Sequence, residues 1–215
     1  MNAKMKPSKH KKQEKLYEIA ESQHGYFTAK QAKQAGFLPK NFHHHVKTEE
    51  WLKEGHGIYR LKNYPSSKYD QLAHYQLWSR NKDDEPQGVY SHETAMSVYE
   101  LSDLDPVKIH MTVPKTFRKS AETPQILKLH SNDLQEGDIN NVEGIRVTSP
   151  LRSLIDLILS GETSLEFAEQ GFHQALVRGL IRRKNLDSNS IPEEAYHYFM
   201  NWLMKKSGAS GIGEN

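Results

Sequence analysis

The 215-residue chain has no cysteine, which excludes disulfide bonds, thiol nucleophiles, cysteine-ligated zinc sites and iron–sulfur clusters. It also lacks long hydrophobic runs. The longest apolar stretch, residues 154–159, is interrupted by Asp156 and is far too short to span a bilayer. No apolar segment follows the basic N-terminus, so no secretory signal peptide is predicted. With 36% hydrophobic residues and a mean hydropathy of -0.80, the chain is polar but foldable, and we expect a soluble cytoplasmic protein without a membrane partner.

The common signatures of catalysis are missing as well. The sequence contains no Gly-x-Gly-x-x-Gly, no Gly-x-x-x-x-Gly-Lys, no Gly-x-Ser-x-Gly and no His-Glu-x-x-His. Ser91, His92 and Glu93 are adjacent at a predicted helix start, where they cannot form a triad, and Ser91 is interpreted as a helix cap. The acidic run 83–85 is interpreted as a solvated linker. We therefore expect no catalytic residues, no cofactor and no enzymatic activity.

Charge is unevenly distributed along the chain. Residues 1–62 carry thirteen lysines and arginines against six acidic residues, a balance of +7. The remainder carries sixteen basic and twenty-one acidic residues, a balance of −5. A basic segment attached to a mildly acidic remainder is typical of a protein that binds a polyanion through one end. A solvated basic tail would give the same distribution of charge.

The first 62 residues show the element order of a winged helix-turn-helix domain. Helical periodicity over residues 9–23 puts three apolar side chains on one face: Leu16, Ile19 and Ala20. After a short extended piece, Thr28 is predicted to cap a second helix over residues 29–35, which ends at Gly36. Pro39 begins a third helix to about residue 49. Residues 51–61 then form a hairpin, which would be the wing.

The third helix is predicted to be apolar inside and basic outside. Phe42 and Val46 point inward with Leu38. This leaves five polar side chains on the outer faces: Lys40, Asn41, His43, His44 and Lys47. Such a helix is typical of one that enters the DNA major groove, where Asn pairs with adenine and Lys with guanine. The alternative is an ordinary solvated face in a domain used for protein contacts.

The run from His43 to His45 invites a metal interpretation. Consecutive helical residues point about 100° apart, so these three side chains cannot face one ion. We therefore predict no metal site there, and the sequence offers none elsewhere.

The second half of the chain mixes helices and strands. Helices are predicted around residues 69–78, 91–101, 165–180 and 192–206, and strands over residues 107–113, 126–130 and 145–148. The strand over 107–113 alternates as if half-buried. Ser149-Pro150 starts a further helix in which Arg152 and Asp156 form a surface ion pair. Four basic residues, Arg178, Arg182, Arg183 and Lys184, cluster near the end of the helix over 165–180.

Taken together, these segments resemble AbiEi-type antitoxins. Residues 25–36 and 57–61 resemble the N-terminal winged helix of that family, and residues 90–95, 109–114 and 147–156 resemble its second domain. The five segments occur in the family's order and cover about residues 12–185.

The resemblance implies an α+β protein: an N-terminal winged helix-turn-helix domain followed by a mixed α/β domain with a small sheet and packed helices. We divide the chain into residues 1–62 (DNA-binding domain), 63–88 (helix and polar linker), 89–206 (antitoxin domain) and 207–215 (disordered tail).

The resemblance also implies a type IV toxin–antitoxin system linked to abortive phage infection. The antitoxin opposes a nucleotidyltransferase-like toxin without a stable complex, and represses its operon by binding inverted repeats in its own promoter. The DNA contacts implied are Thr28, Lys30, Lys40, Asn41, His43, His44, Lys47 and, in the wing, Lys53, His56 and Arg60. The alternative function is a winged-helix transcriptional regulator whose C-terminal domain binds a ligand or partner.

Overall fold

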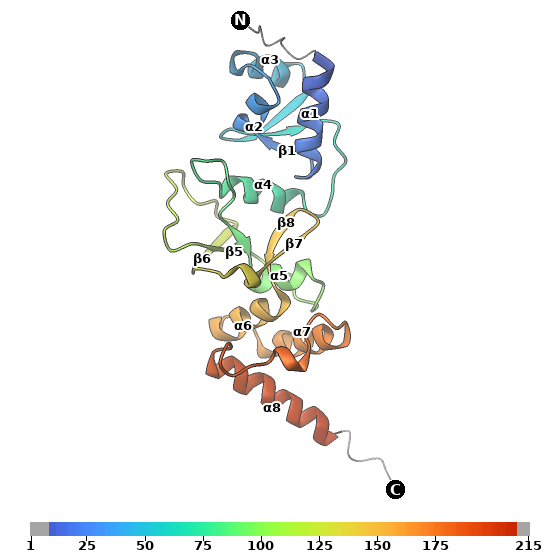
Figure 1. The fold of residues 1–215 in the computed structure, drawn as a ribbon, viewed down its shortest axis with the longest axis vertical. Coiled ribbons are helices and arrows are strands. Elements are labelled where there is room, and N and C mark those ends of the chain that lie inside the picture. Colours follow the sequence, from blue (N-terminus) through green and yellow to red (C-terminus); the bar gives the residue numbers. More distant parts are fainter. Residues whose placement is uncertain (1–8, 210–215) are drawn as a thin grey trace, which may run out of the picture. The chain divides into compact units, whose positions relative to one another are not determined.

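The protein is described here by a computed structural model that covers residues 9–209 (Figure 1). Its backbone contacts divide the chain into two compact units, Met1–Gly88 with Asn141–Arg146, and Val89–Asn140 with Val147–Asn215. The second unit begins at residue 89, and residues 63–88 are grouped with the first unit.

From residue 9 onward, the first unit contains a small antiparallel sheet and four α-helices. Its elements in chain order are α1 (Lys9–Glu21), β1 (Tyr26–Thr28), α2 (Ala29–Gln34), the 3-10 turn η1 (Pro39–Asn41), α3 (Phe42–Lys47), β2 (Trp51–Gly55), β3 (Ile58–Leu61) and α4 (Asp70–Trp78). The sheet order is β1-β3-β2, with Phe27 opposite Tyr59 and Trp51 opposite Leu61.

Local signals account for the boundaries of α2. The Thr28 hydroxyl accepts a hydrogen bond from the Gln31 backbone amide, and the Gln31 side chain accepts one from the Thr28 amide, which completes a capping box. Gly36 has a φ of +97°, the left-handed conformation that stops a helix and that glycine adopts without strain. Both residues therefore act as the sequence predicts.

The core of the first unit joins the helices to the hairpin. Leu16 and Ala20 of α1, Ala32 of α2 and Phe42 of α3 are buried around Trp51. Trp51 makes edge contacts with the rings of Phe27, Phe37 and Phe42. The prediction for Leu38 is wrong: its side chain is exposed, and Phe37 packs against the core instead.

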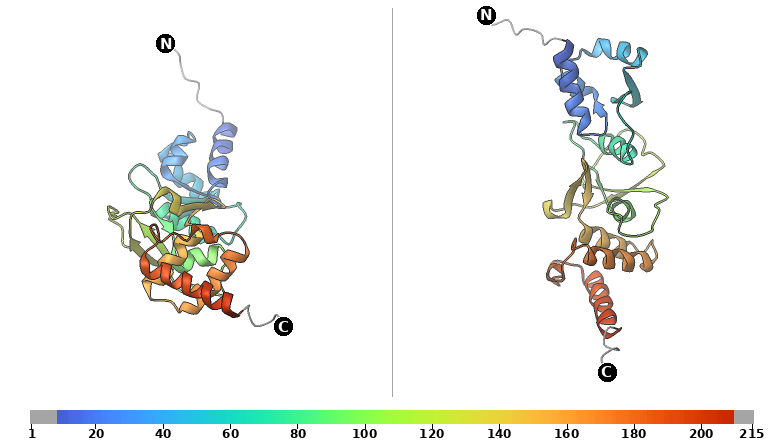
Figure 2. Two further views of the ribbon diagram at one scale, coloured as in Figure 1. Left: turned by 60° about the horizontal axis from the view of Figure 1, so that its bottom comes forward. Right: turned by 90° about the vertical axis from the view of Figure 1, so that its right-hand side faces the viewer.

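The second unit combines strands with a helical layer (Figures 1 and 2). Its elements are β4 (Val89–Tyr90), α5 (His92–Val98), β5 (Ile109–Val113), β6 (Leu127–Ser131), η2 (Glu136–Asp138), α6 (Pro150–Ser160), α7 (Leu165–Val177), η3 (Arg183–Asn185) and α8 (Glu193–Ala209). Strands β7 (Ile139–Val142) and β8 (Ile145–Thr148) are each divided between the two units, since Asn141–Arg146 belong to the first. The strand order is β6-β5-β4-β8-β7, with β5 parallel to β6 and antiparallel to β4.

Two sequence expectations for this sheet are corrected. Strand β5 is buried at every position, so the half-buried alternation predicted for it is wrong: β4 and β6 flank the strand and α5 packs against it. Strand β7 was not predicted, since its sequence Ile-Asn-Asn-Val is polar.

Helices α6, α7 and α8 enclose the larger hydrophobic core. Leu154, Phe172 and Phe199 are fully buried within it, and Met96 of α5 joins them. The Ser149 hydroxyl accepts from the Arg152 amide and Pro150 is the first helical residue, as predicted. Helix α8 extends to Ala209, beyond the predicted tail boundary at 207, and the remaining tail residues 210–215 lie outside the described residues.

No helix within residues 9–209 is both long enough and apolar enough to cross a membrane.

Candidate nucleic-acid interface

The segment predicted as the third helix exposes its polar side chains. It is a 3-10 turn, η1, followed by the six-residue helix α3, rather than one continuous helix from residue 39 to 49. Buried Phe42 attaches it to the core. Five side chains remain exposed around this anchor: Lys40, Asn41, His43, His44 and Lys47. The structure thus brings together the whole predicted set on one short segment.

The three consecutive histidines of α3 separate as helical geometry requires. His43 and His44 are exposed, whereas the half-buried His45 ring stacks on Trp51 at a centroid distance of 4.5 Å. His45 Nδ1 lies 2.7 Å from Glu50 Oε2. His45 therefore belongs to the packing between α3 and the hairpin, in keeping with its omission from the predicted contacts.

The hairpin contributes two further exposed residues. Lys53 is exposed on β2, and His56 is exposed in the tight turn before β3. Gly57, with a φ of +66°, allows this turn. The candidate interface is therefore defined as Lys40, Asn41, His43, His44, Lys47, Lys53 and His56.

Arg60, predicted as a wing contact, does not belong to this interface. Its side chain is buried, and Nη2 lies 3.1 Å from Asp70 Oδ2 and donates to the Pro65 carbonyl at the same distance. The guanidinium also lies 5.5 Å from the centre of the Tyr26 ring. Arg60 shares the sheet face of Ile58, and α4 packs against this sheet. The Arg60 guanidinium therefore stabilises the packing of α4 on the sheet.

Thr28 is also corrected as a DNA contact, whereas the contact of Lys30 stays a prediction. Thr28 is buried at 1% exposure, and its hydroxyl donates to the Asp84 carboxylate. Lys30 is exposed, but its Nζ donates to the Asp83 carbonyl at 2.7 Å. The start of α2 is thus occupied by an acidic segment of the same unit.

The acidic run 83–85 is therefore not a solvated linker. Asp84 pairs with Arg80, with Oδ1 3.0 Å from Nε, and both side chains are mostly buried. Arg80 Nη2 also donates to the His56 carbonyl at 2.9 Å. We name residues 80–86 the acidic loop, which connects the start of α2 with the turn of the hairpin.

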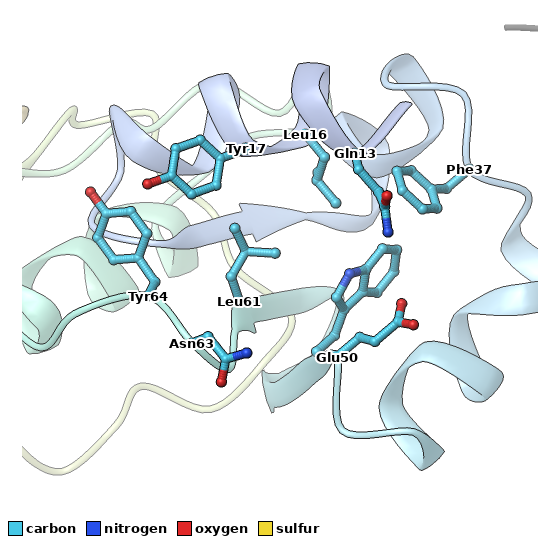
Figure 3. A pocket seen from close by; sticks show the side chains of 9 residues that line it. Gln13, Leu16, Tyr17, Phe37, Glu50, Leu61, Asn63 and Tyr64 are labelled. Carbon is cyan, nitrogen blue, oxygen red and sulfur yellow. The ribbon is translucent and has the colours of Figure 1, made fainter. Parts of the chain in front are cut away.

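A pocket of about 260 Å³ lies beside α1 in the first unit (Figure 3). Leu16 and Tyr17 of α1 face Leu61 and Tyr64 across it, and the two tyrosine rings are 6.1 Å apart. Glu50 lines it and also bonds His45 of α3, so the pocket adjoins the residues that position the candidate interface.

In the second unit, the structure brings together three histidines that the sequence reasoning missed. One ring nitrogen from each of His92, His110 and His130 lies within 4.8 Å of the other two. Burial lowers the pKa of all three imidazoles: the pKa of His92 falls to about 3, that of His130 falls to about 4, and that of His110 lies below its usual value. The three rings are therefore neutral near pH 7. Their separation along the chain hides the cluster. Its only sequence signal is His110 within an otherwise apolar strand.

Ser91 is the N-cap residue of α5, as predicted, but its side chain makes no capping hydrogen bond to the helix. Its hydroxyl accepts from Thr112 Oγ1 at 2.8 Å and lies 2.9 Å from His92 Nδ1. His92 itself has a φ of +50°, an uncommon conformation for a residue with a side chain.

Two basic features of the second unit have structural partners. Arg152 bonds both Asp156, at 2.8 Å, and Asp138, at 3.0 Å, so the predicted surface ion pair is a largely buried three-residue network. Burial raises the pKa of Asp156 despite the nearby Arg152.

Arg178 donates to the Tyr99 carbonyl at 2.6 Å, whereas Arg182, Arg183 and Lys184 are exposed.

Comparison with known proteins gives a family match within the first unit. Residues 14–62 match the family model described as "Transcriptional regulator, AbiEi antitoxin". This match confirms the resemblance over the segment that contains η1, α3 and the hairpin, and it supports an antitoxin with a regulatory role.

No curated protein matches the chain. Among solved structures, the chain is similar to the crystal structure of the RV2827C protein from Mycobacterium tuberculosis, with 11% sequence identity and a TM-score of 0.48. That similarity covers 87% of this chain and 75% of the other.

Proposed function

We propose that this chain, whose residues 14–62 match the AbiEi antitoxin regulators, is a DNA-binding antitoxin that represses its own promoter. Its first unit acts as a winged helix-turn-helix module, with α3 entering the major groove and the hairpin as the wing. The observation that carries the proposal is the exposed basic set on η1 and α3, which lies inside the matched segment.

Each residue of the candidate interface has a distinct chemical role. Lys40, Lys47 and Lys53 would neutralise phosphates and supply most of the affinity. Asn41 would pair with adenine through its amide, and its exposed position before α3 favours this role. His43, His44 and His56 add hydrogen-bond donors to phosphate or base edges. Inverted repeats in the promoter would be read by two copies of the module.

Fluorescence anisotropy with promoter DNA at several salt concentrations tests this role. In Lys40→Ala/Lys47→Ala, we expect the slope of log affinity against log salt to fall by about 0.9 for each lost phosphate contact, close to 2 in total. The matched control is Lys115→Ala/Lys205→Ala, which removes the same charge from exposed lysines of the second unit. Equal losses in both variants would contradict the assignment of α3.

The antitoxin role is tested separately in the full chain. A nucleotidyltransferase-like toxin expressed beside this protein should be neutralised, with growth restored and no stable complex recovered. Because the second unit would carry neutralisation, Lys40→Ala/Lys47→Ala should derepress a promoter reporter and still protect cells. Loss of both activities in a folded variant would show that neutralisation depends on DNA binding.

A plain winged-helix regulator is the second candidate function. It is favoured by the extent of the family match, which ends at residue 62 and leaves the second unit unmatched. In that case the second unit would bind a ligand or partner that modulates DNA affinity. Repression without any protection against the toxin would favour this alternative.

A further inference from the structure

We propose that His92, His110 and His130 form a binding site for one divalent transition-metal ion of the zinc class. The site lies wholly within the second unit and is independent of the DNA-binding role proposed for the first.

The three residues come from adjoining elements of the second unit. His92 is the first residue of α5, His110 lies on β5 and His130 lies on β6. Strands β5 and β6 are parallel neighbours, and their register places Thr112 of β5 opposite His130 of β6. His110 precedes Thr112 by two residues on β5. Residues two apart on a strand share a sheet face, which puts His110 and His130 on the same face. An ion there would connect the start of α5 to both strands.

The distances suit coordination by imidazole. His110 Nδ1 lies 3.1 Å from His130 Nε2. Two nitrogens bound to zinc at about 2.0–2.1 Å in a tetrahedral site lie about 3.3 Å apart, close to this value. The His92 ring stacks on His130 at a centroid distance of 3.7 Å with 15° between the ring planes, so the His92 ring must turn out of the stack to direct its free nitrogen at an ion held by the other two. Three imidazoles leave a fourth position for water.

The outer contacts of the rings match those of metal-bound histidines. Such residues use one nitrogen for the metal and the other for an oxygen that orients the ring. His92 Nδ1 lies 2.9 Å from the Ser91 hydroxyl, and His110 Nε2 lies 3.5 Å from Glu93 Oε2. Glu93 is itself fixed by a hydrogen bond from Thr163. These contacts leave Nε2 of His92 and Nδ1 of His110 for an ion.

Burial and charge also fit a divalent cation. His92 and His110 are buried, whereas His130 is half-buried and leaves a side of the cluster within reach of solvent. Of the two carboxylates nearby, Glu93 lies beside His110 and supplies negative charge, whereas Glu162 is paired with Lys128, whose positive charge acts on all three histidines. Imidazole ligands suit zinc, copper, nickel and cobalt, whereas magnesium and calcium prefer oxygen.

The competing explanation is a hydrogen-bonded histidine network that holds no ion. His110 and His130 can share a proton between their facing nitrogens, which would satisfy both without a metal. Titration of the full chain distinguishes the two. Untagged protein freed of metal with EDTA would be titrated with zinc against a chromophoric chelator. We expect one tightly bound ion per chain. Cobalt in its place should give the intense visible bands of a tetrahedral site.

Variants place the ion. His130→Asn, the least buried change, should weaken zinc binding by more than about 100-fold, because loss of a ligand exceeds the 10- to 100-fold effect of outer contacts. Glu93→Gln, which alters an outer contact only, should weaken it by about 10- to 100-fold. The matched control is His43→Ala/His44→Ala, which removes two exposed histidines from the first unit and should leave the tight site intact.

The wild-type chain provides a second readout if a variant fails to fold. Zinc should shift the imidazole nitrogen resonances of three histidines and leave those of the other nine in place. Absence of a tight ion in the wild type, or zinc binding unchanged by His130→Asn, would overturn the proposal. Loss of the site in the His43/His44 control would assign the ion to α3 instead.

Discussion

Replacing Arg60 by alanine tests whether this residue stabilises the fold or contacts DNA. The substitution removes the ion pair with Asp70 and the hydrogen bond to the Pro65 carbonyl. Breaking a fully buried ion pair costs about 3–5 kcal/mol, since the remaining charge stays buried without its partner.

Two features of the structure reduce this figure. The Asp70 side chain keeps 24% of its exposure, and its other oxygen still accepts from the Ser67 amide, so water and the backbone compensate part of the lost charge. Arg60 Nε is buried and has no hydrogen-bond partner among residues 9–209, so the arginine itself is incompletely satisfied. We therefore expect Arg60→Ala to lower the free energy of unfolding by about 2–3 kcal/mol, or roughly 10 °C in the melting temperature of the first unit.

Urea denaturation of the full chain, followed by circular dichroism and Trp fluorescence, measures the stability. Anisotropy with promoter DNA measures the salt dependence below the unfolding transition. We expect a large loss of stability and an unchanged salt slope. Arg60→Lys should recover only part of the stability, because the ammonium keeps the charge but loses the planar guanidinium that lies over the Tyr26 ring. An unchanged stability together with a salt slope reduced by about one would refute the structural role and return Arg60 to the DNA interface.

Three further predictions concern the acidic loop, the helical core and the histidine cluster. Asp84→Asn should lower the free energy of unfolding by about 1–2 kcal/mol, because it breaks the pair with Arg80, and asparagine tolerates the φ of +74° at this position. The same substitution should tighten DNA binding, because it removes a negative charge beside the start of α2. Weaker binding in anisotropy would contradict the charge argument. Leu154→Ala should cost about 3 kcal/mol in urea denaturation, since this side chain is fully buried among helices, whereas the matched Leu159→Ala at a 43% exposed position should cost less than about 1 kcal/mol. In metal-free protein, the lowered pKa values of His92 and His130 mean that the unfolded chain takes up protons first, so the stability present above about pH 6.5 should decline by about 3 kcal/mol for each of the two rings as the pH falls towards 4. A flat stability over this range in His-resolved NMR and urea titrations would contradict the burial of these rings.

Residues with short-range partners could be predicted from the sequence. Thr28, Gly36 and Ser149 act at helix ends, where the neighbouring few residues decide the backbone conformation. The exposed set on η1 and α3 follows from similar logic, because the spacing of Phe42 and Val46 fixes which face points inward. The buried stripe of Leu16 and Ala20 also follows from helical periodicity alone.

Residues whose environment depends on a distant element could not be placed. Alternation along β3 puts Arg60 on the same face as Ile58, but only the packing of α4 makes this face an interior. Strand β5 was expected to be half-buried, but β4 and β6 flank it and α5 packs against it, and it is buried throughout. The acidic run 83–85 has the composition of a linker, and its role appears only when Asp84 meets Thr28, fifty-six residues earlier.

The amino-acid sequence by itself determined the ends of α2, the start of α6, the hairpin and the basic exposed segment of this protein, because hydrophobic spacing and capping act over a few residues. Only the tertiary structure decided which charges remain accessible and which histidines meet. His92, His110 and His130 converge through the parallel pairing of β5 with β6 and the placement of α5 beside them. Pairing between distant segments depends on the packing of whole elements against one another, which local periodicity does not encode.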